Sequence, residues 1–140
     1  SLTFHYLDVI NFIEQAQAGG TIMKSLKILI ADDDVSFRTL LRRYLEKAGH
    51  GVCLAKDGDE AINGLTTGIN VLITDMDMPK YNGREVLTVA KHGFPHIRRI
   101  AMSEKFHDIT LQNLKELEVE MIFEKEHLKK ALQDADLIPL

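Results

Sequence analysis

The sequence predicts an α/β domain built around a parallel β-sheet. Short apolar runs alternate with amphipathic stretches along most of the chain, as strands and helices do in this class. Two runs, at residues 26–31 and 69–74, are apolar at most positions, as expected for strands buried on both faces of a sheet. The chain has 140 residues, of which 45% are hydrophobic and 27% charged, enough for one ordinary core. We therefore expect a single domain with a (βα)5 pattern.

The first strand and the helix after it are the clearest elements. The run LKILIA at 26–31 ends in consecutive aspartates, and the apolar residues that follow recur at helical spacing. Asp34 has the side chain of a helix N-cap, and Gly49 can adopt the left-handed conformation that often follows a helix. The sequence thus predicts a helix between these two residues.

The other elements continue the alternation. Further strands are expected at 51–55, 69–74, 97–102 and 119–123, and further helices at 57–65, near 83–91, near 108–117 and from about 126. In such a sheet, ligands bind beyond the carboxyl ends of the strands. The residues that follow each strand are therefore the candidates for chemistry.

Residues 1–22 differ from the rest of the chain. A helix there would be apolar on most sides, with one narrow polar stripe made of His5, Asp8, Asn11 and Gln15. Its apolar surface would need a cover, and a homodimer is one way to provide it. We expect residues 1–22 to be an appended helix or a remnant of cloning, and residues 23–140 to form the domain.

Composition excludes several classes of function. The apolar runs are far shorter than the roughly 20 residues of a membrane helix, and a net charge of −4 disfavours nucleic-acid binding. The single Cys53 excludes an internal disulfide and a cysteine-rich zinc site, which suits the reducing cytoplasm. Arg98 and Arg99 form a basic pair that we expect to be a solvated strand entry. We therefore expect a cytoplasmic domain with neither a membrane nor a nucleic-acid partner.

Acidic side chains are expected at the ends of two strands. Asp32 and Asp33 follow the first strand, and Asp75 follows the third. If the sheet gathers them, like charges about 4 Å apart repel by roughly 4 kcal/mol at an effective dielectric near 20. A divalent cation relieves this repulsion. Mg²⁺ is favoured because it is usually held by one or two carboxylates beside a phosphate, whereas Ca²⁺ takes more ligands.

A hydroxyl and an ammonium are expected at the ends of two other strands. Ser103 follows the fourth strand as a hydrogen-bond donor, and Lys125 follows the fifth as a cation that can neutralise a phosphoryl oxygen. An aspartate beside a metal ion and a lysine is suited to attack a phosphoryl group and form an aspartyl phosphate. The strand ends together predict a site for Mg²⁺ and a phosphoryl group.

These motifs resemble those of the receiver domains of bacterial two-component response regulators, including the stand-alone chemotaxis type. The resemblance covers residues 26 to about 136 and rests on LKILIADDD, AKDGDEAI, VLITDMDMPKYNG, AMS and FEK, in family order. It implies a flavodoxin-like doubly wound fold with five parallel strands in the order 2-1-3-4-5. It also implies a phosphorelay protein that is not an enzyme with its own substrate. A sensor histidine kinase or histidine phosphotransfer protein is the implied phosphoryl donor.

The resemblance further implies a role for each site residue. Asp75, followed by MDMP, corresponds to the phosphoacceptor, which holds Mg²⁺ together with the two aspartates after the first strand. Asp77 lies where a main-chain carbonyl completes the protein ligands of the metal. Ser103 corresponds to the hydroxyl that turns toward the phosphoryl group, and Lys125 to the ammonium that bonds it. Phosphorylation is then expected to switch the binding of an unidentified downstream protein.

Three residues depart from the family pattern, and two alternatives remain. Ile122 stands where many receivers have an aromatic switch residue, Glu126 replaces the proline that commonly follows the lysine, and Glu104 replaces a small residue. These changes favour a degenerate receiver that docks partners without phosphorylation. The other alternative is a haloacid-dehalogenase-type phosphatase, since residues 75–77 spell D-x-D. Met78-Pro79 disfavours it, because a hydroxyl residue is expected shortly after that motif.

A narrower expectation concerns the mouth of the predicted crevice. Asp77 and Lys105 lie two residues beyond the acceptor and the hydroxyl. We expect them to pair across the mouth and to shield the acyl phosphate from water, although an exposed ion pair is worth only about 0 to 1 kcal/mol.

Overall fold

The computed structural model describes residues 24–140, with the side chains of residues 108–110 left out. Five parallel strands form one sheet in the order β2-β1-β3-β4-β5. Their bounds are β1 Lys27–Ala31, β2 Gly51–Ala55, β3 Val71–Asp75, β4 Arg98–Ser103 and β5 Met121–Glu124. The predicted α/β fold and the strand order implied by the resemblance are both confirmed. The helix expected at 1–22 lies outside the described residues.

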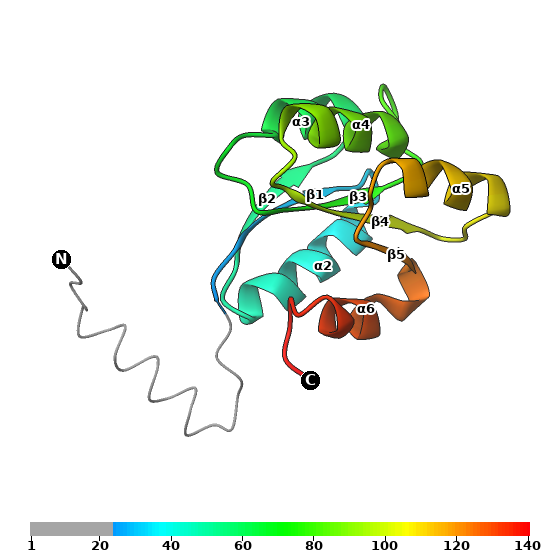
Figure 1. Cartoon of the computed structure of the whole chain (residues 1–140). Helices are drawn as coiled ribbons and strands as arrows, with labels where there is room; N and C mark the ends of the chain where they lie inside the picture. The colour runs from blue at the N-terminus through cyan, green and yellow to red at the C-terminus, as the bar shows by residue number, and fades with distance from the viewer. Residues whose placement is uncertain (1–23) are drawn as a thin grey trace, which may run out of the picture.

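Helices alternate with the strands and cover both faces of the sheet (Figure 1). Their bounds are α2 Val35–Lys47, α3 Gly58–Gly64, α4 Gly83–Gly93, α5 Asp108–Glu116 and α6 Leu128–Asp134, with a 3-10 turn, η1, at Lys125–His127. Helices α3, α4 and α5 lie on one face, and α2 and α6 lie on the other. None of the helices between residues 24 and 140 has the length and apolar character needed to cross a bilayer.

Strand β1 explains why two hydrophobic cores form. Its residues alternate between faces: Ile28 and Ile30 belong to the core under α2 and α6, whereas Leu29 and Ala31 belong to the core under α3, α4 and α5. All four of these residues are at most 1% exposed. Residues buried on either face of a central strand are apolar, and residues 28–31 show this pattern after the exposed Lys27.

Local capping signals fix the helix that follows β1. Asp34 accepts a hydrogen bond from the N–H of Phe37, and Gly49 has a φ of +96° just after the helix. Both predictions are therefore confirmed. Helix α4 begins in the same way, because Asn82 and Glu85 form a reciprocal capping box. Capping side chains thus set the starts of α2 and α4 in the segments that follow β1 and β3.

Arg99 contradicts the expectation of a solvated strand entry. The residue is only 8% exposed, and its guanidinium donates hydrogen bonds to the main-chain oxygens of Ile97 (2.9 Å) and Leu117 (3.3 Å). It lies in β4, between β3 and β5. Its partners belong to the segment just before β4 and to the one just after α5. Only Arg98 fits the expectation in part, since it is half-buried and pairs with the exposed Glu120.

Candidate functional site

The carboxyl ends of β1 and β3 bring three aspartates together. These strands are neighbours in register, with Ala31 beside Thr74, so the next residues along, Asp32 and Asp75, meet at the same edge. Carboxylate oxygens of Asp32, Asp33 and Asp75 all lie within 4.8 Å of one another. Asp32 is fully buried and Asp75 is 5% exposed, whereas Asp33 is exposed. The acidic cluster expected from the sequence is therefore present.

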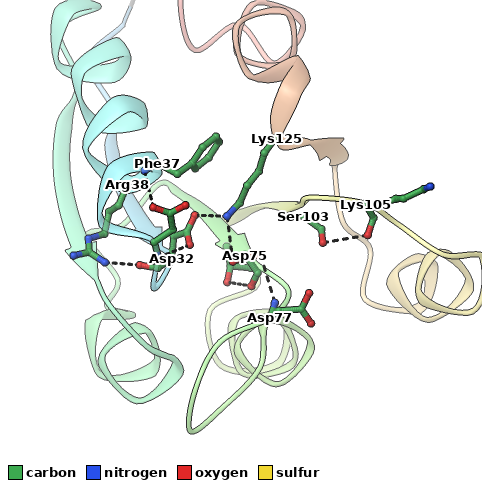
Figure 2. Close-up of polar contacts among 10 residues, drawn as sticks. Asp32, Phe37, Arg38, Asp75, Asp77, Ser103, Lys105 and Lys125 are labelled. Carbon is green, nitrogen blue, oxygen red and sulfur yellow. Dashed lines mark hydrogen bonds and ion pairs between the residues drawn. The ribbon is translucent and has the colours of Figure 1, made fainter.

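Lys125 points into this cluster from the end of β5 (Figure 2). Its Nζ lies 2.8 Å from Asp32 Oδ2 and 3.3 Å from Asp75 Oδ2, and its side chain is 6% exposed. Burial lowers the pKa of Lys125, but the adjacent carboxylates of Asp32 and Asp75 outweigh burial and raise the pKa above its usual value. The ammonium is therefore charged and shared between two acids.

Asp75 carries an unusual charge balance. Burial is the main cause that raises its pKa to about 6, and repulsion by the Asp32 carboxylate adds to it. The Lys125 charge and the main-chain N–H of Asp77, which lies 3.4 Å from Asp75 Oδ1, act in the opposite direction. At neutral pH the Asp75 carboxylate is thus mostly ionised and available as a nucleophile, but it is held at an energetic cost.

The oxygen set fits a hard divalent cation. Asp32 Oδ2 is buried and has no assigned hydrogen-bond donor among the described residues, although the Lys125 ammonium lies 2.8 Å away as its ion-pair partner. A buried carboxylate oxygen beside two further carboxylates is the donor set that Mg²⁺ prefers. The positions of the Asp32, Asp33 and Asp75 side chains thus suit the cation expected there.

Ser103 and Asp77 flank Asp75 on the other side. Ser103 is 4% exposed and donates its hydroxyl to the main-chain oxygen of Lys105 at 3.2 Å. The carboxylate of Asp77 points away from Asp75, and only its N–H faces that residue. The use of the Asp77 carbonyl as a metal ligand stays a prediction.

The expected ion pair between Asp77 and Lys105 is wrong for this structure. Both side chains are exposed and line one hollow of about 240 Å³ together with Phe106 and Arg84, yet no nitrogen–oxygen contact within 4.0 Å joins them in the described part of the chain. Sequence spacing places both residues at the mouth of the crevice, but it does not determine where two long, solvated side chains point.

Two residues of the site were not found from the sequence. The Phe37 ring lies under the Lys125 ammonium, 4.7 Å from ring centroid to Nζ, and Arg38 Nη1 donates to the main-chain oxygen of Asp32 at 2.6 Å. The helical apolar pattern marks Phe37 only as a core residue. Its position in the first turn after the acidic pair is the one signal that places it near the crevice.

The three departures from the family pattern lie around the site without filling it. Glu104 and Glu126 are exposed, and Ile122 is half-buried. Ile122 packs against the core under α3, α4 and α5. Among the described residues, neither glutamate forms an ion pair with Lys125, and the exposed carboxylate of Glu126 lies 3.7 Å from His127 Nε2. The geometry of the crevice is therefore intact despite these substitutions.

Comparison with known proteins gives a consistent result. The response regulator receiver domain family matches residues 28–135. The transcriptional regulatory protein CpxR of Escherichia coli is 43% identical over 61 residues, which is 44% of this chain and 26% of CpxR. The regulatory protein PhoP of Bacillus subtilis is 37% identical over 87 residues, or 59% of this chain and 36% of PhoP. The chain thus spans about a quarter to a third of these relatives.

Solved structures agree with the sequence match. The isolated receiver domain of RcsB from Salmonella enterica, determined with phosphomimetic BeF3−, superposes with a TM-score of 0.70 and 28% identity, covering 81% of this chain and 89% of that one. A CheY-like receiver domain protein from Methanospirillum hungatei has the same fold, with a TM-score of 0.72 at 20% identity, over 81% of this chain and 92% of that one. With the family matched over most of its length, the chain belongs to the response regulator receiver domains of two-component signalling.

Proposed function

We propose that Asp75 is the residue through which this receiver domain accepts a phosphoryl group. One observation supports this assignment above all. The Asp75 carboxylate lies at the end of β3, 3.3 Å from the Lys125 ammonium and within 4.8 Å of the oxygens of Asp32 and Asp33. A nucleophile, a cation and a metal-binding acid pair thus surround one point in space.

The proposed reaction transfers a phosphoryl group from a phosphohistidine. An Asp75 Oδ atom forms a bond to phosphorus while the N–P bond breaks, and its electron pair leaves with the imidazole of the donor. Lys125 bonds a phosphoryl oxygen, and the Ser103 hydroxyl turns to it from the Lys105 carbonyl. Water later attacks phosphorus, which releases inorganic phosphate and restores the carboxylate.

Mg²⁺ is the proposed cofactor of both steps. Asp32, Asp33 and Asp75 would hold it, with the main-chain carbonyl of Asp77 as a further ligand. When bound, the ion neutralises charge on the phosphoryl oxygens and orients the group for in-line attack.

The proposed donor is a sensor histidine kinase or a histidine phosphotransfer protein in the cytoplasm. The chain acts as a switch rather than as an enzyme with turnover on a separate substrate. The phosphorylated form binds a downstream protein differently from the unmodified form. The matched relatives CpxR and PhoP are described as transcriptional regulators, and the match covers only a part of each.

A small phosphodonor tests the assignment of Asp75. We expect acetyl phosphate with Mg²⁺ to add the mass of one phosphoryl group to the wild-type protein, as measured by intact mass spectrometry. The label should be absent in Asp75→Asn and after chelation of Mg²⁺. Asp59→Asn is the matched control and should still be labelled, because Asp59 is an exposed residue in the first turn of α3 and has no role in the proposed site.

A docking module without phosphorylation is the second candidate, and Ile122 is the observation that favours it. Without an aromatic side chain at this position, the usual coupling between the hydroxyl and a buried ring is absent. If the wild-type protein is not labelled and Mg²⁺ causes no NMR shift at Asp32 or Asp75, these results support the docking module. Labelling that is lost in Asp75→Asn excludes it.

A further inference from the structure

The contact between Lys125 and Phe37 has no role in the reaction described so far. The ring centroid lies 4.7 Å from Nζ, within the distance at which a cation is attracted to the face of an aromatic ring. Phe37 is half-buried and the Lys125 side chain is 6% exposed, so water screens this attraction little. The ammonium therefore has three partners: Asp32, Asp75 and the ring.

We propose that Phe37 is a positioning residue that keeps the Lys125 ammonium directed at Asp75 once a cation occupies the acidic cluster. This inference rests on the proposed function and deepens it, because it identifies a residue of α2 that acts on the phosphoryl-accepting site through Lys125. Phe37 itself has no atom that takes part in the chemistry.

Competition for the carboxylates gives the physical reason. The shorter of the two ion pairs joins Lys125 to Asp32, at 2.8 Å, and Asp32 is also a candidate metal ligand. A divalent cation at Asp32 takes over the oxygen that the ammonium uses and repels the ammonium charge. The ring has no oxygen to offer a hard cation, so a metal does not remove it as a partner. It attracts Lys125 without neutralising the charge that a phosphoryl oxygen needs.

The backbone fixes Phe37 in this position. Its N–H donates to the capping carboxylate of Asp34 at 3.2 Å, and the next residue, Arg38, donates to the main-chain oxygen of Asp32 at 2.6 Å. The first turn of α2 is thus bonded to the same short segment that carries the acidic pair. The ring and the acids are therefore held in one hydrogen-bonded segment, and Lys125 reaches them from the end of β5 on the other side (Figure 2).

The substitution after Lys125 makes such a partner more important. Glu126 stands where the family commonly has a proline, and here it is the exposed middle residue of η1. An acyclic residue at this position leaves the main chain after Lys125 less restricted than a proline does. The contacts of the Lys125 side chain, including the one with Phe37, therefore contribute more to the position of the ammonium.

Three variants test the proposal. Phe37→Leu keeps an apolar side chain but removes the ring face, and Phe37→Tyr restores a ring. Tyr44→Leu is the matched control, because Tyr44 lies two turns further along α2, is also half-buried and packs against the same core. The first readout is the NMR shift of the Lys125 Hε protons without metal, which ring currents move upfield when the ammonium lies over an aromatic face.

The second readout is the binding of BeF3− in saturating Mg²⁺, with the rate of labelling by acetyl phosphate. We expect Phe37→Leu to lose the upfield shift, to bind BeF3− about three- to tenfold more weakly and to label more slowly by a similar factor. Phe37→Tyr and Tyr44→Leu should both stay within about twofold of wild type. Phe37→Tyr and Tyr44→Leu together distinguish the loss of the aromatic ring face from a general loss of packing at α2.

Several results would overturn the proposal. An unshifted Lys125 Hε resonance in the wild type removes the contact, and equal loss of BeF3− affinity in Phe37→Leu and Tyr44→Leu makes it an effect of packing. If the wild type is labelled at Asp75 and Phe37→Leu matches it, the positioning role alone fails. If the wild type is neither labelled nor binds BeF3−, the proposed function fails, and the positioning role fails with it.

Discussion

Asp75 is destabilising to the fold while it is ionised. Its pKa is about 6 in the folded protein, against 3.8 for an unperturbed aspartate, so the folded state holds this proton more tightly than the unfolded chain does. The benefit of protonation to stability is fully present below about pH 4 and is lost as the pH rises through about 6. At neutral pH the ionised Asp75 therefore lowers the stability of the folded state, because it is buried and is repelled by Asp32.

Removing this charge should stabilise the protein. We expect Asp75→Asn to raise the free energy of unfolding at pH 8 by roughly 1 to 3 kcal/mol, because a neutral amide avoids the cost of a buried carboxylate. Urea unfolding at pH 8 and at pH 5 measures the effect, and the gain should shrink at the lower pH. A variant that is less stable than wild type at pH 8 contradicts this reading of the site.

The candidate site was predictable from the sequence where strand ends carry the chemistry. Asp32, Asp33, Asp75, Ser103 and Lys125 each follow an apolar run, and parallel topology alone brings such residues to one edge. Contacts that depend on side-chain conformation were not predictable. The absent pair between Asp77 and Lys105, and the Phe37 ring under Lys125, depend on the rotamers of these side chains.

At the scale of elements, α4 begins in close contact with the end of β3, where Asp75 lies. Gly83 is the first residue of α4, and its N–H donates to the main-chain oxygen of Met76 at 3.0 Å. A Cβ atom on Gly83 would lie 2.2 Å from the main-chain oxygen of Asp75. The helix thus approaches the end of β3 more closely than any side chain permits.

Adding one methyl group to Gly83 should therefore disturb both stability and function. We expect Gly83→Ala to cost roughly 1 to 3 kcal/mol of stability, since backbone must move to admit the methyl, and to slow labelling of Asp75. Thermal unfolding and acetyl phosphate labelling measure the two effects. Gly93→Ala is the control at the other end of α4, where a Cβ meets no atom within 4 Å, and it should be neutral or stabilising by up to about 1 kcal/mol.

Buried Arg99 joins the two connections on either side of β4. Its guanidinium bonds the main-chain oxygens of Ile97 and Pro95 before the strand, and of Leu117 after α5. We expect Arg99→Met to cost about 2 to 3 kcal/mol, because these carbonyls lose their donors. Arg98→Met should cost about 1 kcal/mol or less, since its partner Glu120 is exposed. Equal losses in urea unfolding would contradict this difference.

The elements themselves were predicted well from periodicity, and their ends were not. The strand expected at 119–123 is instead Met121–Glu124, and the last helix begins at Leu128 because η1 comes first. Apolar runs mark where a segment is buried, but hydrogen bonds to a neighbouring strand decide where the ladder stops. The same limit explains Arg99, whose polar partners come from loops that the sequence pattern does not describe.

For the whole molecule, cation binding and folding should be linked. If Mg²⁺ binds the folded acidic cluster and not the unfolded chain, it stabilises the protein by about 2.7 kcal/mol at a hundredfold excess over Kd. We expect a rise in Tm with Mg²⁺ for the wild type, measured by calorimetry, and a much smaller rise for Asp32→Asn. A variant that responds as strongly as wild type would show that the ion binds elsewhere.

His50 connects the beginning and the end of the described chain. Its Nδ1 accepts the N–H of Leu26 at 3.0 Å, which places the ring proton on Nε2, and Nε2 faces the main-chain oxygen of Leu137 at 2.7 Å. The ring is 5% exposed, so replacing it with phenylalanine would leave two main-chain groups unbonded, at about 1 to 3 kcal/mol. We expect such a loss in urea unfolding of His50→Phe, and an unchanged midpoint would contradict it.

The imidazole also decides where anything attached to the last residues begins. Leu26 precedes β1, and Leu137 is held beside it, so a polypeptide joined after Leu140 departs from the amino edge of the sheet, while the acids sit at the carboxyl edge. An appended module of that kind starts at the opposite edge of the sheet from Asp75, the proposed phosphoacceptor. For a change at Asp75 to affect such a module, it has to be transmitted along the length of the strands, or the module has to fold back to the carboxyl edge.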